Sequence, residues 1–409
     1  MRPLLVIDVV GLTRKLISAQ STPHLYQFLT QGFFYPLKGV LPLVTCSSQS
    51  TILTGKTPSE HGIVANGWYF RDLAQVFLWR QSNGLVQSDN LLDEAKLRNP
   101  SFTSAKMFWW YNMYSHADIS VTPRPAYLAD GRKIPDVYTK PYSLRDSLTQ
   151  QFGCFPLFRF WGPATDISAT TWITNATLSV MDSFQPTLVL VYLPHLDYNL
   201  QRLGPEHLAL HKDLKEVDLE VGRLLKKAKE QGRNVAILSE YGIYPVNKPV
   251  HINLILRKHG FLGIHHQYGM DQLDCGNCRA FAVSDHQIAH VYVADPRDIP
   301  AVRELLLQTE GIAHVLSSRE EKESVGLAHE RSGEIIVLSQ KDRWFTYYFW
   351  ENPDDEPDFA RTVDIHRKPG YDPVELFREP GFSTKLKIFH FLLKKTLGFR
   401  ALMKIIPLN

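Results

Sequence analysis

Hydroxyl and thiol side chains gather in one short stretch of the chain, residues 44–68. Thr45 and Cys46 follow a proline-containing turn, and three serines come directly after them, Ser47, Ser48 and Ser50. We expect a helix to begin at this point. The free backbone N–H groups and the positive dipole end of a helix N-terminus attract phosphate and favour an anionic nucleophile. The stretch therefore predicts nucleophilic chemistry on a phosphate, provided that another group removes the proton of the nucleophile.

Three carboxylates stand in or after short apolar runs. Asp8 interrupts the first run of the chain, Asp197 follows residues 188–193, and Glu240 follows residues 235–238. Such runs are typical of buried strands in a parallel sheet, and ligands bind at the carboxyl ends of these strands. We therefore expect the three carboxylates to converge at one edge. A buried carboxylate is costly unless it is paired or binds a metal, although Asp8 has helix capping as an alternative role.

The predicted cluster has the chemistry of a metal site. Carboxylates, a histidine and a hydroxyl suit Zn²⁺, Mn²⁺ or Mg²⁺. Two metals about 4 Å apart would clamp the attacking and leaving oxygens of a phosphoryl group. His366 lies in a turn-rich segment and is either a ligand or a structural histidine. His195, Asn199 and Gln201 are further potential ligands beside Asp197.

Apolar runs that alternate with helical patterns, such as residues 206–231, predict an α/β fold with a mostly parallel central sheet. We expect a single α/β catalytic domain over residues 1–383. Residues 69–160, which are rich in aromatics and proline, and residues 265–350 are expected to be insertions, the first of them a lid near the site.

Bulk composition excludes several classes of protein. The chain has 409 residues, of which 44% are hydrophobic, so a large core is expected. A net charge of +3 argues against a nucleic-acid partner, and four cysteines are too few for a disulfide scaffold. The sequence predicts neither a signal peptide nor a transmembrane helix, and cytoplasmic localisation is the default expectation. The sequence does not predict the oligomeric state.

Residues 384–409 form a basic tail. Six basic residues and no acidic ones alternate there with phenylalanines and leucines. One interpretation is an amphipathic helix on an anionic membrane surface. The simpler interpretation is a helix docked on the domain with its basic face in solvent.

Several motifs together resemble the type I phosphodiesterase/nucleotide pyrophosphatase family of the alkaline phosphatase superfamily. The matching segments, in chain order, are Asp8, Thr45 with TGKTPSEHGIVANGW, YLPHLDYNLQRLGP, ILSEYGI and PGYD. Within this family, WYFRD and HRKPGYDPVELF resemble the phosphodiesterase-like group of bacterial ebo gene clusters, which accompany secondary metabolism.

The resemblance implies an alkaline-phosphatase-like α/β/α sandwich with inserted cap segments, a threonine nucleophile and two divalent metal ions, with zinc as the first choice. Thr45 would be the residue that is transiently phosphorylated or nucleotidylated, and Ser48 would take the place of an asparagine that contacts phosphate oxygens. The implied metal ligands are Asp8, Thr45, Asp197, Gln201, Glu240, Tyr241 and His366.

The chain departs from the family pattern at its ligands. Gln201 stands where a histidine is typical, Glu240-Tyr241 replaces an Asp-His pair, and Pro369 takes the place of the last histidine, three residues after His366. Glutamine is a poor zinc ligand, so at least one metal site is expected to be altered. The side chains that would compensate are His195, Asp285 and His286.

Two functions follow from these patterns. The first is metal-dependent hydrolysis of a phosphodiester, a pyrophosphate or a monoester of a nucleotide-like or metabolite substrate through a covalent Thr45 intermediate. The second is a catalytically impaired protein that binds a phosphorylated ligand or a protein partner. The aromatic segment 108–114 is expected either to stack on a ring of the substrate or to pack in the lid or core.

Overall fold

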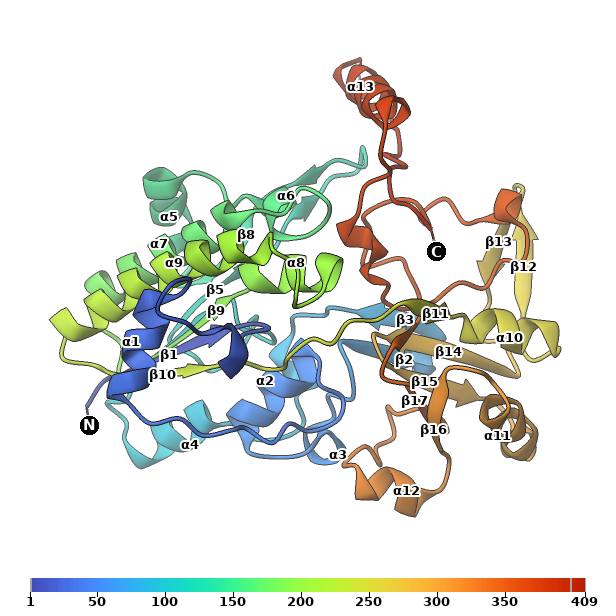
Figure 1. Cartoon of the computed structure of the whole chain (residues 1–409), viewed down its shortest axis with the longest axis horizontal. Coiled ribbons are helices and arrows are strands. Elements are labelled where there is room, and N and C mark those ends of the chain that lie inside the picture. Colours follow the sequence, from blue (N-terminus) through green and yellow to red (C-terminus); the bar gives the residue numbers. More distant parts are fainter. Residues whose placement is uncertain (1, 398, 409) are drawn as a thin grey trace. The chain divides into compact units, whose positions relative to one another are not determined.

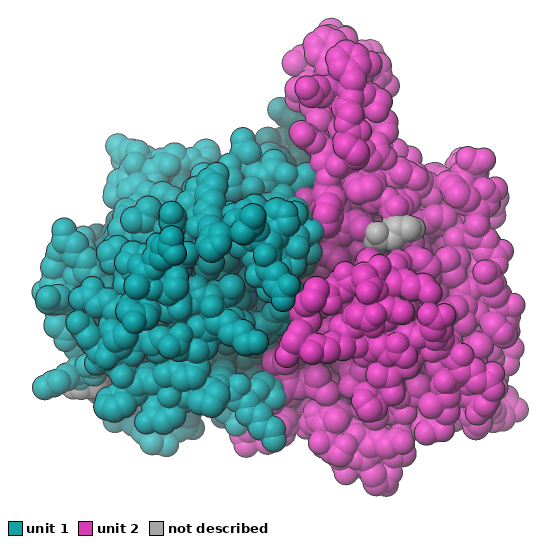
Figure 2. All heavy atoms as spheres, viewed as in Figure 1, with its two compact units in different colours: residues 1–39, 48–55, 81–243 teal, residues 40–47, 56–80, 244–409 magenta. Residues whose placement is uncertain are grey.

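The computed structural model describes residues 2–397 and 399–408, and the chain divides into two compact units. Unit 1 comprises residues 1–39, 48–55 and 81–243, and unit 2 comprises residues 40–47, 56–80 and 244–409 (Figure 2). Each unit encloses its own hydrophobic core.

Unit 1 is an α/β unit. Its strands are β1 (Leu4–Val9), β4 (Ser104–Met107), β5 (Ile119–Pro123), β6 (Ala126–Tyr127), β7 (Lys133–Ile134), β8 (Val137–Lys140), β9 (Leu188–Leu193) and β10 (Asn234–Leu238). Its helices are α1 (Pro23–Gln31), α4 (Leu91–Arg98), α5 (Leu144–Phe152), α6 (Leu157–Phe160), α7 (Ile167–Phe184), α8 (His195–Leu203) and α9 (Leu210–Glu230). Helix α2 (Thr45–Thr54) begins in residues assigned to unit 2 and continues in unit 1.

Six strands of unit 1 form one sheet in the order β10-β1-β9-β4-β5-β8. All neighbours are parallel except the edge pair β5 and β8. Strands β1 and β9 are apolar and almost completely buried, which requires cover on both faces. Helices lie on both sides of the sheet (Figure 1). The predicted α/β class with a mostly parallel sheet is confirmed.

The segment 69–160, expected as an insertion, contributes β4, β5 and β8 to the central sheet. These strands have only four or five residues, and β4 contains Lys106. The Lys106 ammonium is buried and donates to the carbonyls of Trp110 and Tyr111, and burial lowers its pKa to about 7. The expected single domain with its two insertions stays a prediction.

Unit 2 contains a four-stranded antiparallel sheet in the order β14-β15-β17-β16. The bounds of these strands are β14 (Ala280–Asp285), β15 (Ile288–Val293), β16 (Ile312–Leu316) and β17 (Ile335–Ser339). Three further strand pairs are β2 (Gly67–Phe70) with β3 (Gln75–Leu78), β11 (Lys248–Val250) with β18 (Arg343–Phe345), and β12 (Ile264–Gln267) with β13 (Met270–Leu273). The helices are α3 (Pro58–His61), α10 (Ile252–Lys258), α11 (Ile299–Leu307), α12 (Arg319–Ser324) and α13 (Phe382–Thr396).

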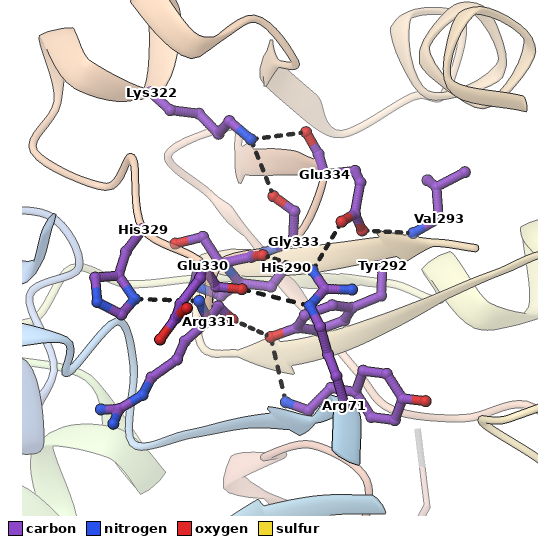
Figure 3. A network of polar contacts seen from close by, with 12 residues as sticks. Arg71, His290, Tyr292, Val293, Lys322, His329, Glu330, Arg331, Gly333 and Glu334 are labelled. Atoms are coloured by element: carbon purple, nitrogen blue, oxygen red, sulfur yellow. Dashed lines mark hydrogen bonds and ion pairs between the residues drawn. The ribbon is translucent and has the colours of Figure 1, made fainter. Parts of the chain in front are cut away.

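A polar network lies along β15 of unit 2 (Figure 3). The Glu334 carboxylate accepts hydrogen bonds from Arg71 at 2.7 Å and from the backbone N–H of Val293 at 2.8 Å. The ring of His290 is completely buried; its Nε2 donates to the Val64 carbonyl at 3.1 Å, and its Nδ1 accepts from the N–H of Gly333 at 3.2 Å. Both carboxylate oxygens of Glu334 and both ring nitrogens of His290 thus have partners of complementary chemistry.

Helix α13 stands out from the rest of unit 2 (Figure 1). Its residue Ile388 packs against a small cluster formed by Val374, Ile405 and Ile406. Among the described residues, no helix is both long and apolar enough to cross a membrane.

Candidate functional site

The carboxyl ends of three adjacent strands carry the predicted carboxylates of unit 1. Asp8 is the next-to-last residue of β1 and is paired in register with Tyr192 of β9 and Leu238 of β10. Glu240 comes two residues after β10, and Asp197 lies in the first turn of α8, directly after β9. All three carboxylates are buried, with exposed fractions of 0% for Asp8, 3% for Glu240 and 5% for Asp197.

Gln49 of α2 connects two of these carboxylates. Its side-chain nitrogen donates to Glu240 Oε1 at 2.6 Å and lies 3.3 Å from Asp8 Oδ2. Its side-chain oxygen accepts from the backbone N–H of Trp110 at 2.7 Å. Because that N–H needs an acceptor, the amide oxygen faces Trp110 and the amide nitrogen faces the carboxylates.

The electrostatics around Asp8 disfavour its ionised form. Burial, followed by the charge of neighbouring Glu240, raises the pKa of Asp8 well above its usual range. Its Oδ1 atom is buried and accepts no hydrogen bond from the described residues. Burial also raises the pKa of Tyr192, and the charges of Glu240 and Asp197 act in the same direction. This end of the sheet is therefore a region of negative potential that would be stabilised by a cation.

Asp197 is held by two of the substituted positions. Gln201, one turn later in α8, donates to Asp197 Oδ2 at 2.7 Å, and the Tyr241 hydroxyl donates to Asp197 Oδ1 at 3.2 Å. The structure thus brings Asp197, Gln201 and Tyr241 into contact, and their role as metal ligands stays a prediction. In each case, a neutral donor occupies the position at which an imidazole was expected.

Thr45 is the first residue of α2 and is 4% exposed. Thr45 and Gln49 are four residues apart, which places them on the same face of the helix. Asn66 of unit 2 accepts a hydrogen bond from the backbone N–H of Cys46 at 3.0 Å, next to Thr45. Asn66 in turn donates its own backbone and side-chain N–H groups to Asp285 at 2.9 and 3.2 Å. Asn66 therefore fixes the first turn of α2.

The alternative ligands lie in other groups. His195 Nε2 faces α9, 3.1 Å from Glu216 Oε2 and 3.5 Å from Asp213 Oδ1. The ligand atoms of these three residues lie within 4.8 Å of one another. In unit 2, Asp285 holds Asn66 and contacts His286, whose ring stacks on Tyr371. His366, also in unit 2, is partly buried, and its backbone N–H donates a hydrogen bond to Asp364 Oδ1 at 3.3 Å.

The structure also describes Ser48 and the aromatic segment 108–114, for which the sequence predicted contacts with the substrate or packing in the lid or core. The Ser48 hydroxyl is buried and has no hydrogen-bond partner among the described residues, so it is available to a ligand oxygen. Phe108 and Trp109 are buried in the core of unit 1, where Phe108 packs against Phe155 and Trp172. For these two rings, packing in the core is the role that the structure shows.

Sequence reasoning did not identify Gln49 and Asn66. The four-residue spacing from Thr45 to Gln49 was the signal for the first, since it is the spacing of one helix face. Asn66 lies inside the VANGW motif, but nothing in the sequence indicates that its side chain bonds the residue after Thr45.

The donor set of unit 1 fits a divalent cation. Carboxylates and an amide or phenol oxygen are hard ligands, and the buried Oδ1 of Asp8 offers an acceptor to a metal. The imidazole that zinc favours is absent from the cluster formed by Asp8, Asp197, Gln201, Glu240 and Tyr241 in unit 1, all of which the structure describes.

The family model of the type I phosphodiesterases/nucleotide pyrophosphatases matches residues 4–372. An uncharacterised pyrophosphatase/phosphodiesterase of Schizosaccharomyces pombe is 21% identical over 249 residues, which are 60% of this chain and 45% of that protein. A bis(5′-adenosyl)-triphosphatase of Bos taurus is 24% identical over 267 residues, 61% of this chain and 49% of that protein. The chain therefore spans about half the length of the curated relatives that it matches.

Two solved structures share the fold. Murine ectonucleotide pyrophosphatase/phosphodiesterase 5, an inactive variant in complex with AMP, has a TM-score of 0.57 and 14% identity, covering 87% of this chain and 82% of that one. Phosphonoacetate hydrolase of Sinorhizobium meliloti has a TM-score of 0.61 and 13% identity, covering 87% and 84%. At this identity the likeness shows the fold alone, which agrees with the predicted alkaline-phosphatase-like sandwich.

Proposed function

The chain belongs to the type I phosphodiesterase/nucleotide pyrophosphatase family, and we propose that it hydrolyses a phosphoester bond of a small phosphorylated substrate. The observation that carries this proposal is the convergence of Asp8, Asp197 and Glu240, all buried, at the carboxyl ends of β1, β9 and β10. Open parallel sheets bind ligands at this edge. The bond is a phosphodiester or pyrophosphate in a nucleotide-like or metabolite substrate.

The proposed nucleophile is the Thr45 hydroxyl. Its oxygen forms a bond to phosphorus while the bond from phosphorus to the leaving oxygen breaks, and the leaving oxygen takes up a proton. Water then attacks the phosphorylated Thr45, restores the hydroxyl and releases the phosphate product. The N-terminal position of Thr45 in α2 favours the extra negative charge of this reaction. The proposed role of the Ser48 hydroxyl, which is buried and has no hydrogen-bond partner among the described residues, is to donate to a phosphate oxygen.

Two divalent metal ions complete this proposal. The family resemblance implies zinc as the first choice, whereas the oxygen donors of unit 1 also suit Mn²⁺ or Mg²⁺. When bound, the two ions would favour the ionised threonine hydroxyl and stabilise charge on the phosphate oxygens. The residues proposed to hold them are Asp8, Thr45, Asp197, Gln201, Glu240, Tyr241 and His366. The role of Gln49 is to orient Asp8 and Glu240 through its amide, whose direction is fixed by the N–H of Trp110.

The test compares Thr45→Ala with Thr45→Ser and with Thr54→Ala, a matched control at the other end of α2. Hydrolysis of bis(p-nitrophenyl) phosphate and of a dinucleoside polyphosphate is followed after loading with Zn²⁺, Mn²⁺ or Mg²⁺. Thr45→Ala should lower kcat by about a thousand-fold or more with an unchanged melting temperature, whereas Thr45→Ser retains part of the activity. Full activity of Thr45→Ala would show that the nucleophile is wrong. A wild-type chain that cleaves neither substrate with any of these metals would contradict the hydrolase proposal.

A further inference from the structure

Helix α13 exposes a continuous apolar stripe. Phe382, Leu386, Phe389, Leu393 and Leu397 recur every three or four residues, the spacing of one helix face. Their exposed fractions lie between 46% for Leu393 and 73% for Phe382. A contiguous exposed patch of large apolar side chains indicates a surface that binds a protein, a membrane or a ligand. We refer to these five residues as the α13 stripe.

The α13 stripe is not the face through which the helix is attached to unit 2. Thr384 is 2% exposed, and Ile388 packs against Val374 and Ile406. At 100° per residue, Thr384 and Ile388 point away from the direction of Leu386 and Phe389. Docking of the helix on its own unit, the simpler interpretation of the sequence, therefore leaves about half or more of each side chain in the stripe exposed.

The charges around the stripe indicate what covers it. Residues 384–409 include Lys385, Lys387, Lys394, Lys395, Arg400 and Lys404 and no acidic residue. Lys387 forms an ion pair with Glu379 at 2.6 Å, and Lys395 lies over the Phe391 ring. Lys385 and Lys394 flank the stripe on its two sides, so an apolar strip lies between cations.

We propose that the α13 stripe lies in the interfacial region of an anionic lipid bilayer, with the flanking lysines against the lipid headgroups. An apolar face bordered by lysines is the pattern of a helix that lies in the plane of a membrane surface. A second copy of the helix would bring like charges together around the same stripe, which disfavours self-association.

The experiment is co-sedimentation of the full chain with vesicles of phosphatidylcholine alone or with added phosphatidylglycerol. The stripe variant is Leu386→Ser, Phe389→Ser and Leu393→Ser together. The control replaces three apolar residues of similar or greater exposure elsewhere, Leu97→Ser, Leu208→Ser and Tyr268→Ser. All six side chains are exposed, so both variants are expected to fold.

The wild-type chain and the control should bind anionic vesicles, and the stripe variant should bind at least about ten-fold more weakly. Lys385→Glu with Lys394→Glu, or high salt, should also weaken the binding. No binding by the wild type, or equal binding by the stripe variant, would overturn the proposal. So would equal binding to neutral vesicles, or a dimer without lipid that the stripe variant abolishes. None of these measurements depends on hydrolysis.

Discussion

Two buried carboxylates, Asp8 of unit 1 and Glu375 of unit 2, have different electrostatic surroundings. Glu375 and Lys368 are each 2% exposed and form an ion pair at 2.5 Å, and the Lys368 ammonium also donates to the Thr362 carbonyl. In the part of the chain that the structure describes, no lysine or arginine forms an ion pair with Asp8. Its neighbours are the Gln49 amide and a second carboxylate, Glu240.

This contrast supports the proposal that Glu375 has a structural charge and Asp8 a functional one. A protein that needs Asp8 only for stability would give it a cation, as it does for Glu375, because an uncompensated buried charge is expensive. Asp8 instead stands beside another carboxylate, which raises its pKa. The folded state thus carries an electrostatic cost in unit 1 that a bound cation would remove, and this is the physical basis of the proposed metal site.

The largest expected effect comes from Asp8→Asn, which removes the charge and keeps the shape. Hydrolysis should fall by about a thousand-fold, equivalent to about 4 kcal/mol of transition-state stabilisation. The melting temperature of the metal-free protein should rise, because the substitution removes a carboxyl whose ionised form the folded state disfavours. Enzyme kinetics and thermal melts in chelator measure the two effects.

A matched control for Asp8→Asn is Glu334→Gln in unit 2, where the carboxylate has Arg71 as its partner. This substitution should lower the melting temperature and leave hydrolysis unchanged. If Asp8→Asn lowers the metal-free melting temperature as Glu334→Gln does, Asp8 is an ordinary structural charge.

The next effect in size concerns Lys368→Met. It leaves Glu375 buried beside an apolar side chain, and the free energy of unfolding should fall by about 3–5 kcal/mol in urea titrations. The double variant Lys368→Met with Glu375→Leu removes both charges and should recover most of the loss. If the double variant is as unstable as the single one, shape and not charge explains the effect.

The sequence predicted these strand ends well, because Asp8, Asp197 and Glu240 each interrupt or follow a short apolar run that is typical of a strand. The expected burial holds for β1 and β9, whereas β10 lies at the edge of the sheet and is only partly buried. The sequence did not predict β4, because Lys106 in a strand suggests an exposed edge. Lys106 is buried there, and its ammonium donates hydrogen bonds to the carbonyls of Trp110 and Tyr111. These contacts depend on the conformation of the loop after β4, which the local sequence pattern does not predict.

The same limit applies to the site. Gln49 reaches Glu240 across 191 residues of sequence, and Asn66 reaches Asp285 across 219. Periodicity places each residue on its own element but does not say which elements meet. The ligand set implied by family resemblance therefore stays a prediction, although Gln201 and Tyr241 both form hydrogen bonds with Asp197.

The smallest expected effect is the pH dependence of stability that arises from His290, a buried residue of the network in Figure 3. Burial lowers the pKa of His290 to about 4, and the neutral ring already donates from Nε2 and accepts at Nδ1. An unfolded histidine titrates near pH 6.5, so between that pH and about 4 the unfolded chain binds more protons. Stability therefore falls as the pH decreases through this window, by about 2 kcal/mol at pH 5 relative to pH 7.

Urea titrations at pH 7 and pH 5 measure this loss, with His290→Gln as the variant and His259→Gln, an exposed site, as the control. His290→Gln should lower stability at pH 7, since the Gly333 N–H loses its acceptor, but its stability should change less between the two pH values. An unchanged pH dependence in this variant would mean that protons enter elsewhere, and His61, whose pKa burial also lowers to about 4, is then the group to replace. Either result identifies a buried histidine of unit 2 that the folded state keeps neutral. Asp8 of unit 1 differs, because its neighbour is a second carboxylate, Glu240.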